Sequence, residues 1–219
     1  MMAGMAQDHP IFTESIRRIR SALGDTGLAG LEQQVLERLI HSSGDLSLQS
    51  LVYFSSNACD QGLRALQTGA FILTDTEMAK AAVAPMARRT LGTEVRTVLE
   101  WAREPVVGER TRTSVGMQRA WSEMTLSSER PAPVVLIGSA PTALETLLTI
   151  VEAGATKPSL VIGMPVGFVG VPESKQHLSK SGLAQIRLDG TRGGAGLAGA
   201  AVNALLRAAH TLQAKSNND

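Results

Sequence analysis

Residues 134–155 read V-V-L-I-G-S-A-P-T-A-L-E-T-L-L-T-I-V-E-A-G-A, and they give the clearest indication of the class of fold. An apolar run ends at Gly138, and after Pro141 the apolar residues recur at helical spacing. The pattern predicts a buried strand, a turn and a helix, because a strand covered on both faces needs no polar alternation. Glu145 and Glu152 interrupt the stretch, so it does not predict a membrane span.

The same order of strand and helix recurs along most of the chain. Parallel strands must be joined by crossover helices, so this alternation predicts an α/β fold in three layers, with helices on both faces of a mainly parallel sheet. We expect strands at residues 51–54, 70–73, 95–99, 134–137, 160–162 and 184–188. We expect the helices between and after them at residues 58–67, 77–88, 114–124, 142–152, 173–179 and 195–213.

Two amphipathic helices precede the first predicted strand. Thr13 is expected to cap a helix that ends at Leu23, and the second helix ends near Gly44, a residue typical of helix C-termini. His41 lies in the last turn of the second helix, where the negative end of the helix dipole favours a charged imidazole. It either donates a proton to a ligand or only caps the last helical carbonyls. Arg38 shares its helical face and can hold an anion beside it.

The amino-acid composition argues against several classes of function. The 219 residues, 43% hydrophobic and 19% charged, can bury a core, and we expect one domain over 1–219 with flexible tails at 1–12 and 214–219. A net charge of +1 and 3% aromatic residues argue against a nucleic-acid partner. One cysteine, Cys59, and four dispersed histidines predict neither a disulfide nor a metal site. With no targeting or membrane segment visible, we expect a cytoplasmic protein.

Three turns at predicted strand ends are candidates for ligand contact, since ligands gather at the carboxyl ends of parallel strands. In the first turn, Ser139 or Thr142 is expected to cap the following helix. The second, residues 163–175, reads G-M-P-V-G-F-V-G-V-P-E-S-K, and its glycines bring the backbone close either to a ligand or to another subunit. The third, residues 189–205, carries Arg192, which suits a carboxylate. None of the three matches a nucleotide-binding fingerprint or a nucleophile elbow.

Several blocks, taken in order, resemble one family, the precorrin-8X methylmutases, also called cobalt-precorrin-8 methylmutases. The resemblance covers almost the whole chain. It implies a flavodoxin-like fold, a homodimer, and an isomerisation without cofactor in which a methyl group moves from ring carbon 11 to ring carbon 12 of a corrinoid. The matching blocks are S-I-R-R-I-R at 15–20, R-L-I-H-S-S-G at 38–44, T-R-T-S at 111–114, G-S-A-P-T-A-L at 138–144, the Gly-rich turn at 163–175, and R-G-G at 192–194.

The resemblance also implies which residues form the site. His41 takes the role of proton donor or acceptor, and Ser15 and Arg38 fall at positions that contact the substrate. A tetrapyrrole (corrinoid) substrate carries acetate and propionate arms, which call for arginine side chains and free backbone N–H groups. The further expected contacts are Arg112, Thr113, Gly163, Gly167, Gly170, Ser174 and Arg192.

Some positions depart from the pattern of that family. Ser139 replaces an asparagine, H-S-S-G replaces H-A-C-G, and residues 82–84 are all Ala or Val where the family often has a glycine and a threonine. These departures leave His41 in place, but they motivate the alternative that the chain binds or carries a corrinoid without converting it. A Rossmann-like enzyme that uses a nucleotide is a further alternative, and the missing phosphate fingerprint speaks against it.

Overall fold

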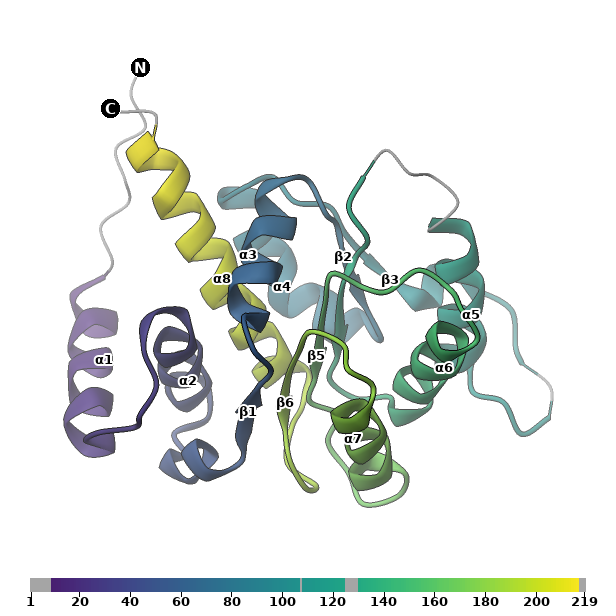
Figure 1. Cartoon of the computed structure of the whole chain (residues 1–219), viewed down its shortest axis with the longest axis horizontal. Helices are drawn as coiled ribbons and strands as arrows, with labels where there is room; N and C mark the ends of the chain where they lie inside the picture. Colours follow the sequence, from purple (N-terminus) through teal and green to yellow (C-terminus); the bar gives the residue numbers. More distant parts are fainter. Residues whose placement is uncertain (1–8, 107, 125–129, 217–219) are drawn as a thin grey trace.

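The computed structural model describes residues 9–106, 108–124 and 130–216, and helices cover both faces of its six-stranded sheet (Figure 1). The strands are β1 (Val52–Phe54), β2 (Ile72–Thr74), β3 (Val95–Thr97), β4 (Val134–Ile137), β5 (Leu160–Gly163) and β6 (Gln185–Leu188). The α-helices are α1 (Pro10–Leu23), α2 (Gly30–Ser43), α3 (Ala58–Gln67), α4 (Glu77–Arg89), α5 (Arg112–Met124), α6 (Pro141–Glu152), α7 (Val171–Lys180) and α8 (Ala195–Ser216). Two 3-10 helices, η1 (Leu46–Ser50) and η2 (Val98–Trp101), complete the described elements. The predicted three-layer α/β fold is confirmed.

The strands lie in the order β1-β6-β5-β4-β2-β3. Counted without β1, the remaining five strands are parallel and follow the flavodoxin-like order, with the reversal of strand order between β2 and β4. β1 is the exception, because it pairs antiparallel with β6 and places Val52 opposite Leu188. The mainly parallel sheet is therefore confirmed, with one antiparallel strand at its edge.

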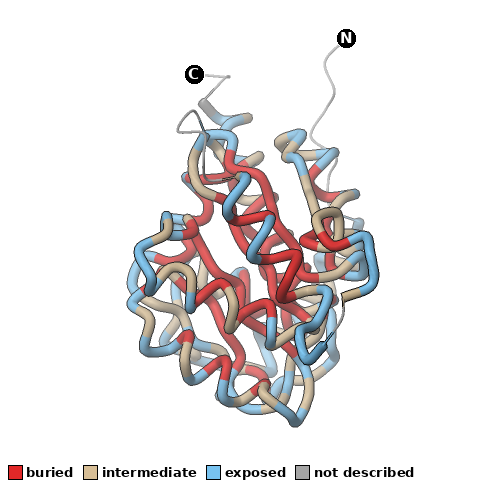
Figure 2. The backbone as a smooth tube through the Cα atoms, turned by 90° about the vertical axis from the view of Figure 1, so that its right-hand side faces the viewer, coloured by how far each residue is buried: buried red, intermediate tan, exposed pale blue. Residues whose placement is uncertain are grey.

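The core divides into one cluster on each face of the sheet. In β4, Leu136 belongs to the cluster formed with α2, α3, α4 and α8, whereas Val135 and Ile137 belong to the cluster formed with α5, α6 and α7. Figure 2 shows the buried residues running through the middle of the molecule, with exposed residues around them. Alternate residues of a strand point to opposite faces, so a strand buried on both faces reads as a continuous apolar run.

Helix α1 lies on the outer side of α2 and has no buried residue. It begins at Pro10 with His9 as its N-cap, and the Ile11 N–H donates to His9 Nδ1 at 3.3 Å. The expectation that Thr13 caps this helix is wrong, because proline suits the first helical position and starts the helix earlier. Residues 9–12 and 214–216, expected in flexible tails, belong to the ends of α1 and α8, and the rest of both tails lies outside the described residues.

The turn between β4 and α6 is held by a carboxylate from another strand end. Asp75, which follows β2, is buried, and its Oδ2 accepts hydrogen bonds from the backbone N–H groups of Gly138, Ser139 and Ala140 at 3.0, 2.6 and 2.8 Å. The expectation that Ser139 or Thr142 caps α6 is therefore wrong, because the N-cap is Ala140 and Asp75 satisfies the free N–H groups from across the sheet. Burial raises the pKa of Asp75, and the three N–H bonds oppose that rise.

Candidate functional site

Helices α1 and α2 bring together two of the predicted site residues. Ser15 Oγ lies 2.8 Å from His41 Nδ1, and within the described residues the other ring nitrogen of His41 has no hydrogen-bond partner. The two helices are fastened by Arg20, which donates to the buried Glu37 carboxylate at 2.6 and 2.9 Å. The imidazole of His41 is exposed, so one nitrogen is held by the protein and the other faces outward.

The Phe12 ring packs against His41, and two guanidinium groups lie over the same Phe12 ring. The Phe12 ring meets the His41 ring edge to face, with centroids 5.1 Å apart and an interplanar angle of 87°. The guanidinium carbon of Arg38 lies 4.2 Å from the Phe12 centroid, and that of Arg207, from α8, lies 5.4 Å from it. Such contacts orient both cations over an aromatic face. The site therefore combines an exposed imidazole with positive charge held close to it.

Arg192 lies beside the end of the helix that carries His41. Its guanidinium donates to the Asp45 carboxylate and to the Ser47 hydroxyl. Asp45 follows Gly44, the left-handed residue that ends α2, and accepts from the Ser47 N–H at 3.0 Å. Hydrogen bonds from Ser47 and the charge of Arg192 hold the pKa of Asp45 below its ordinary value. The structure thus joins the turn after β6 to the turn after α2.

The two Gly-rich turns after β5 and β6 are interlocked by backbone contacts. Gly167 N–H donates to Thr191 O at 3.0 Å, and Gly194 N–H donates to Met164 O at 2.8 Å. A Cβ at Gly193 would lie 2.1 Å from Met164 O, so only glycine fits there. The tip of the turn after β5 exposes apolar side chains, and the exposed fractions of Val166, Phe168 and Val169 are 50%, 85% and 89%.

Two predicted contact residues lie inside the fold rather than on its surface. Ser174 is fully buried and its hydroxyl donates to Val171 O at 2.9 Å. Gly163 is buried in β5, where a Cβ would lie 2.4 Å from Leu178 Cδ2. The packing of α7 against the sheet explains both positions, and contact of either residue with a substrate stays a prediction. Gly170 lies partly exposed at φ 73°, where it begins α7.

Arg112 and Thr113 form a separate group at the start of α5. The Thr113 hydroxyl lies 3.3 Å from that of Thr142 at the start of α6, and the Thr111 hydroxyl lies 2.7 Å from Thr142. Arg112 Nε donates to Ala102 O at 3.1 Å. Ser15, Arg38 and Arg192 are thus grouped with His41, while Arg112 and Thr113 lie with α5 and α6 on the other face of the sheet.

A model of the precorrin-8X methylmutase family matches residues 10–208. The chain belongs to this family. It is 35% identical over 213 residues to cobalt-precorrin-8 methylmutase of Synechocystis sp., covering 91% of this chain and 95% of that relative. It is 36% identical over 200 residues to precorrin-8X methylmutase of Pseudomonas aeruginosa, covering 89% and 93%. The crystal structure of precorrin-8X methyl mutase from Thermus thermophilus matches with a TM-score of 0.81 and 37% identity, over 92% of this chain and 98% of that one.

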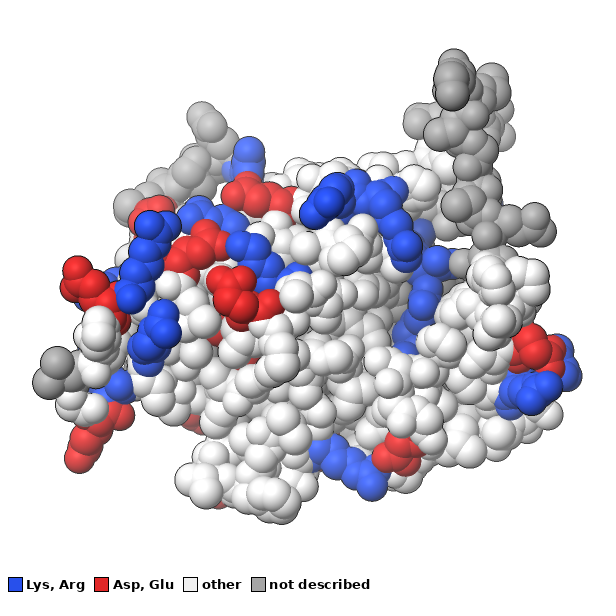
Figure 3. Space-filling model, turned by 180° about the vertical axis from the view of Figure 1, so that it is seen from behind, with Lys and Arg blue, Asp and Glu red and all other residues white. Residues whose placement is uncertain are grey.

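Figure 3 shows the face opposite to that of Figure 1, on which Lys and Arg side chains gather along a hollow and much of the surrounding surface is neutral. Within residues 9–106, 108–124 and 130–216, no group of His, Cys, Asp and Glu side chains is arranged to hold a metal ion. Among the helices of the same ranges, none has both the length and the apolar character that crossing a membrane requires.

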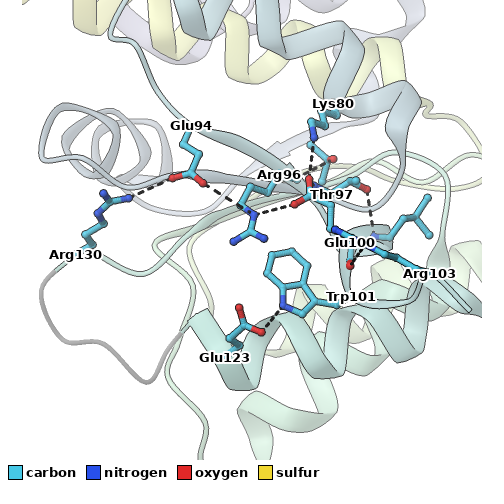
Figure 4. A network of polar contacts seen from close by, with 11 residues as sticks. Lys80, Glu94, Arg96, Thr97, Glu100, Trp101, Arg103, Glu123 and Arg130 are labelled. Atoms are coloured by element: carbon cyan, nitrogen blue, oxygen red, sulfur yellow. Dashed lines mark hydrogen bonds and ion pairs between the residues drawn. The ribbon is translucent and has the colours of Figure 1, made fainter.

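A polar network outside the site lies at the edge strand β3 (Figure 4). Glu100 accepts from Lys80 at 2.8 Å and from Arg96 at 2.9 Å. Arg96 stacks on Trp101 at 3.9 Å, and the Trp101 indole N–H donates to Glu123 at 2.7 Å. Charged side chains along an edge strand hinder pairing with another chain. We therefore assign this network to the edge of the sheet and not to the site.

One open depression of about 650 Å³ lies at the amino ends of the parallel strands, away from every predicted site residue. Its lining includes Tyr53, Gln185 and two exposed cations, Arg64 and Lys157. The predicted site residues in the turns after β5 and β6 lie at the opposite edge, where these turns meet the end of α2. The depression therefore does not mark the site.

Several residues that shape the site were not predicted from the sequence. Phe12 was hidden because the predicted helix began at Thr13, and with the true start Phe12 and Ser15 lie three residues apart on one face of α1. Asp45 and Arg207 act through contacts between distant elements, so no local pattern reveals them. Lys175 belongs to the quoted Gly-rich block, but only the structure shows which groups its ammonium reaches.

Proposed function

We propose that this chain, acting as one cytoplasmic domain, converts precorrin-8X to hydrogenobyrinate, or the cobalt-containing form to cobyrinate. The reaction moves a methyl group from ring carbon 11 to ring carbon 12 of the tetrapyrrole. The match of the family model to residues 10–208 supports an isomerase of this kind. The observation that carries the proposed mechanism is the exposed His41 ring, with one nitrogen held by Ser15 at 2.8 Å.

A methyl shift within one molecule needs no oxidant or reductant, because no atom enters or leaves the substrate. His41 transfers a proton from Nε2 to the conjugated ring system, and the positive charge lowers the barrier to migration of the methyl group. The same nitrogen takes a proton back as the product forms. Ser15 Oγ accepts from Nδ1–H of the charged ring and so directs Nε2 toward the substrate.

Arginine side chains are suited to the anionic arms of the substrate. Arg38 lies beside His41, and Arg192 lies at the neighbouring turn, so both can meet arms on the side of the ring that His41 protonates. Arg112 and Thr113 suit an arm elsewhere on the macrocycle. The backbone of Gly167 and Gly170 borders the same edge of the sheet, while Gly163 and Ser174 support it from inside.

A second copy of the chain is the partner that we propose for the exposed apolar surfaces. Helix α1 carries Ser15 and yet has no buried residue, and Ile11 on this helix is 73% exposed. Phe168 and Val169 are also almost fully exposed. Apolar surface of this kind is typical of subunit interfaces. Sedimentation at micromolar concentration is expected to show a dimer, and a monomer there would contradict the proposal.

The decisive experiment is anaerobic incubation of the protein with precorrin-8X and, separately, with the cobalt form, followed by absorption spectroscopy. Conversion to the hydrogenobyrinate or cobyrinate spectrum supports the proposed function, and binding without conversion supports the carrier alternative. His41→Ala is expected to lower turnover by about 100-fold or more while product binding survives. His177→Gln, which alters a histidine on α7 outside the site, is the matched control and should turn over as the wild type does. Full activity of His41→Ala would overturn the mechanism.

A further inference from the structure

Lys175 of α7 has a buried ammonium group that is held by backbone alone. Only 1% of the residue is exposed. Its Nζ donates to Gly190 O at 2.8 Å and to Arg192 O at 2.5 Å, and no ion pair of Lys175 is found in residues 9–106, 108–124 and 130–216. Burying a charge without an opposite charge is unfavourable, and an apolar side chain of similar length would fill the same space. The two carbonyls are therefore the reason for a lysine here.

We propose that Lys175 is a positioning residue, which fixes the backbone at residues 190–192 and thereby places Arg192 to bind a carboxylate arm of the substrate. The inference rests on the proposed function and adds to it a residue that does not touch the substrate. Lys175 has almost no exposed atom, so it acts only through the turn that it holds.

The bonds from Lys175 hold a part of the turn after β6, residues 190–192, that the other contacts of the turn hold only in part. Its end is held by the bond from Gly194 N–H to Met164 O, and Thr191 O accepts from Gly167 N–H. Gly190 at φ 73° and Gly194 at φ 130° take backbone conformations that side chains rarely adopt, so hydrogen bonds rather than side-chain packing hold the backbone between them. The carbonyl of Arg192 has its bond from Lys175, and the guanidinium of the same residue reaches Asp45 and Ser47. Lys175 thus connects α7 to the turn that follows α2.

The protonation state of Lys175 agrees with this role. Burial lowers the pKa of its ammonium to about 8, and the charge of Asp189 opposes the shift. The group therefore remains mostly charged at neutral pH, and both carbonyls accept bonds from the charged form. A charged donor forms stronger hydrogen bonds than a neutral one, so its loss should loosen the turn.

The first test compares Lys175→Met, Lys175→Arg and the control Lys180→Met, which alters an exposed lysine of the same helix. Hydrogen exchange of the Gly194 and Gly167 amides reports on the turn without any substrate. We expect Lys175→Met to speed exchange at both amides by about tenfold or more. Lys175→Arg keeps the charge and the donors and should restore most of the protection, and Lys180→Met should match the wild type. Unchanged exchange in Lys175→Met would overturn the proposal.

The second test is a double-mutant cycle with Arg192→Ala. If Lys175 acts through Arg192, Lys175→Met should raise KM about tenfold with little change in kcat, and the same change should add almost nothing to Arg192→Ala. An equal rise of KM in both backgrounds would show a merely structural role and overturn the proposal. Should Lys175→Met fail to fold, Lys175→Gln takes its place in both tests and is read in the same way. A wild-type chain that converts neither substrate would instead defeat the proposed function and leave the exchange result standing.

Discussion

The exposed surface at His41 and the buried turns beside it at the carboxyl edge of the sheet use charge in opposite ways. His41 is exposed, and its ring is held by one side chain, the Ser15 hydroxyl. Asp75 and Lys175 are buried, and both form hydrogen bonds with backbone groups. Three N–H groups donate to Asp75, and two carbonyl oxygens accept from Lys175. Asp75 also accepts from the neighbouring Thr76 hydroxyl at 3.2 Å, so most of its bonds, but not all, go to backbone. A buried titratable group that is bonded in this way holds a turn. A group with an exposed nitrogen is available to a ligand.

The two regions also differ in how they are attached to the core. Asp75 follows β2 and Lys175 lies in the middle of α7, and both elements contribute residues to the buried clusters, so the turns that these two residues hold are attached to the core. Ser15 lies on α1, which contributes no buried residue and is fastened to α2 by the pair of Arg20 and Glu37. Stability should therefore depend most on the buried charges, and turnover most on the exposed pair.

The largest effect on stability is expected for Asp75→Ala. The substitution leaves three backbone N–H groups without their acceptor, and one such buried group costs about 1–3 kcal/mol, so the free energy of unfolding should fall by about 3 kcal/mol or more. Asp75→Asn keeps an oxygen in place and should lose less. Urea unfolding measures both. Asp60→Ala, which removes an exposed carboxylate on α3, is the control and should cost no more than about 1 kcal/mol. Equal losses in Asp75→Ala and Asp60→Ala would contradict the structural role of Asp75.

For Ser15→Ala, we expect a large loss of turnover and almost no loss of stability. Removing the hydroxyl frees the His41 ring to turn, so kcat should fall by about 10- to 100-fold, since small errors in the position of a reacting group are costly. The free energy of unfolding should change by less than about 0.5 kcal/mol, because Ser15 is not buried. Ser21→Ala, on an exposed position of the same helix, is the matched control. A large loss of stability with unchanged turnover would place Ser15 with the structural charges instead.

Most of the fold could be predicted from sequence because it depends on local patterns. Strands such as β4 and β5 are continuous apolar runs, and glycine or proline marks the turns that follow them. The prediction failed where the conformation of a turn depends on a residue that is distant in the sequence. Asp75 lies 63 positions from Gly138, and no pattern within residues 138–144 shows that a carboxylate from β2 will occupy the turn.

The site could be predicted only in part for the same reason. His41 stood out by its place at the end of a helix and by the family resemblance, and Ser15 and Arg38, which the sequence also predicted at the site, lie close to it in the structure. The pairing of Arg192 with Asp45 spans 147 positions, so the sequence could supply a candidate cation but not its partner. Lys175 belongs to a conspicuous Gly-rich block of the sequence. Its burial and its two carbonyl partners arise from tertiary packing, which no sequence pattern shows.

The smallest effect is expected at His177, a histidine that is partly exposed, as His41 is exposed, but lies outside the site. Its two ring nitrogens bond Glu145 at 2.7 Å and Glu152 at 2.8 Å, and these bonds, with Glu145 the larger cause, raise its pKa above the ordinary 6.5. A raised pKa means that the stabilisation is complete below the unfolded value and is lost as pH rises through the folded one. Wild type should therefore exceed His177→Gln in Tm near pH 6, by an amount worth at most about 1 kcal/mol, and converge with it near pH 9. Turnover should be unchanged, because exposure makes a histidine catalytic only where a ring nitrogen is left for the substrate, and at His177 both are taken. A difference in Tm that grows with pH would show that the ring is not the charged form that these two carboxylates bind.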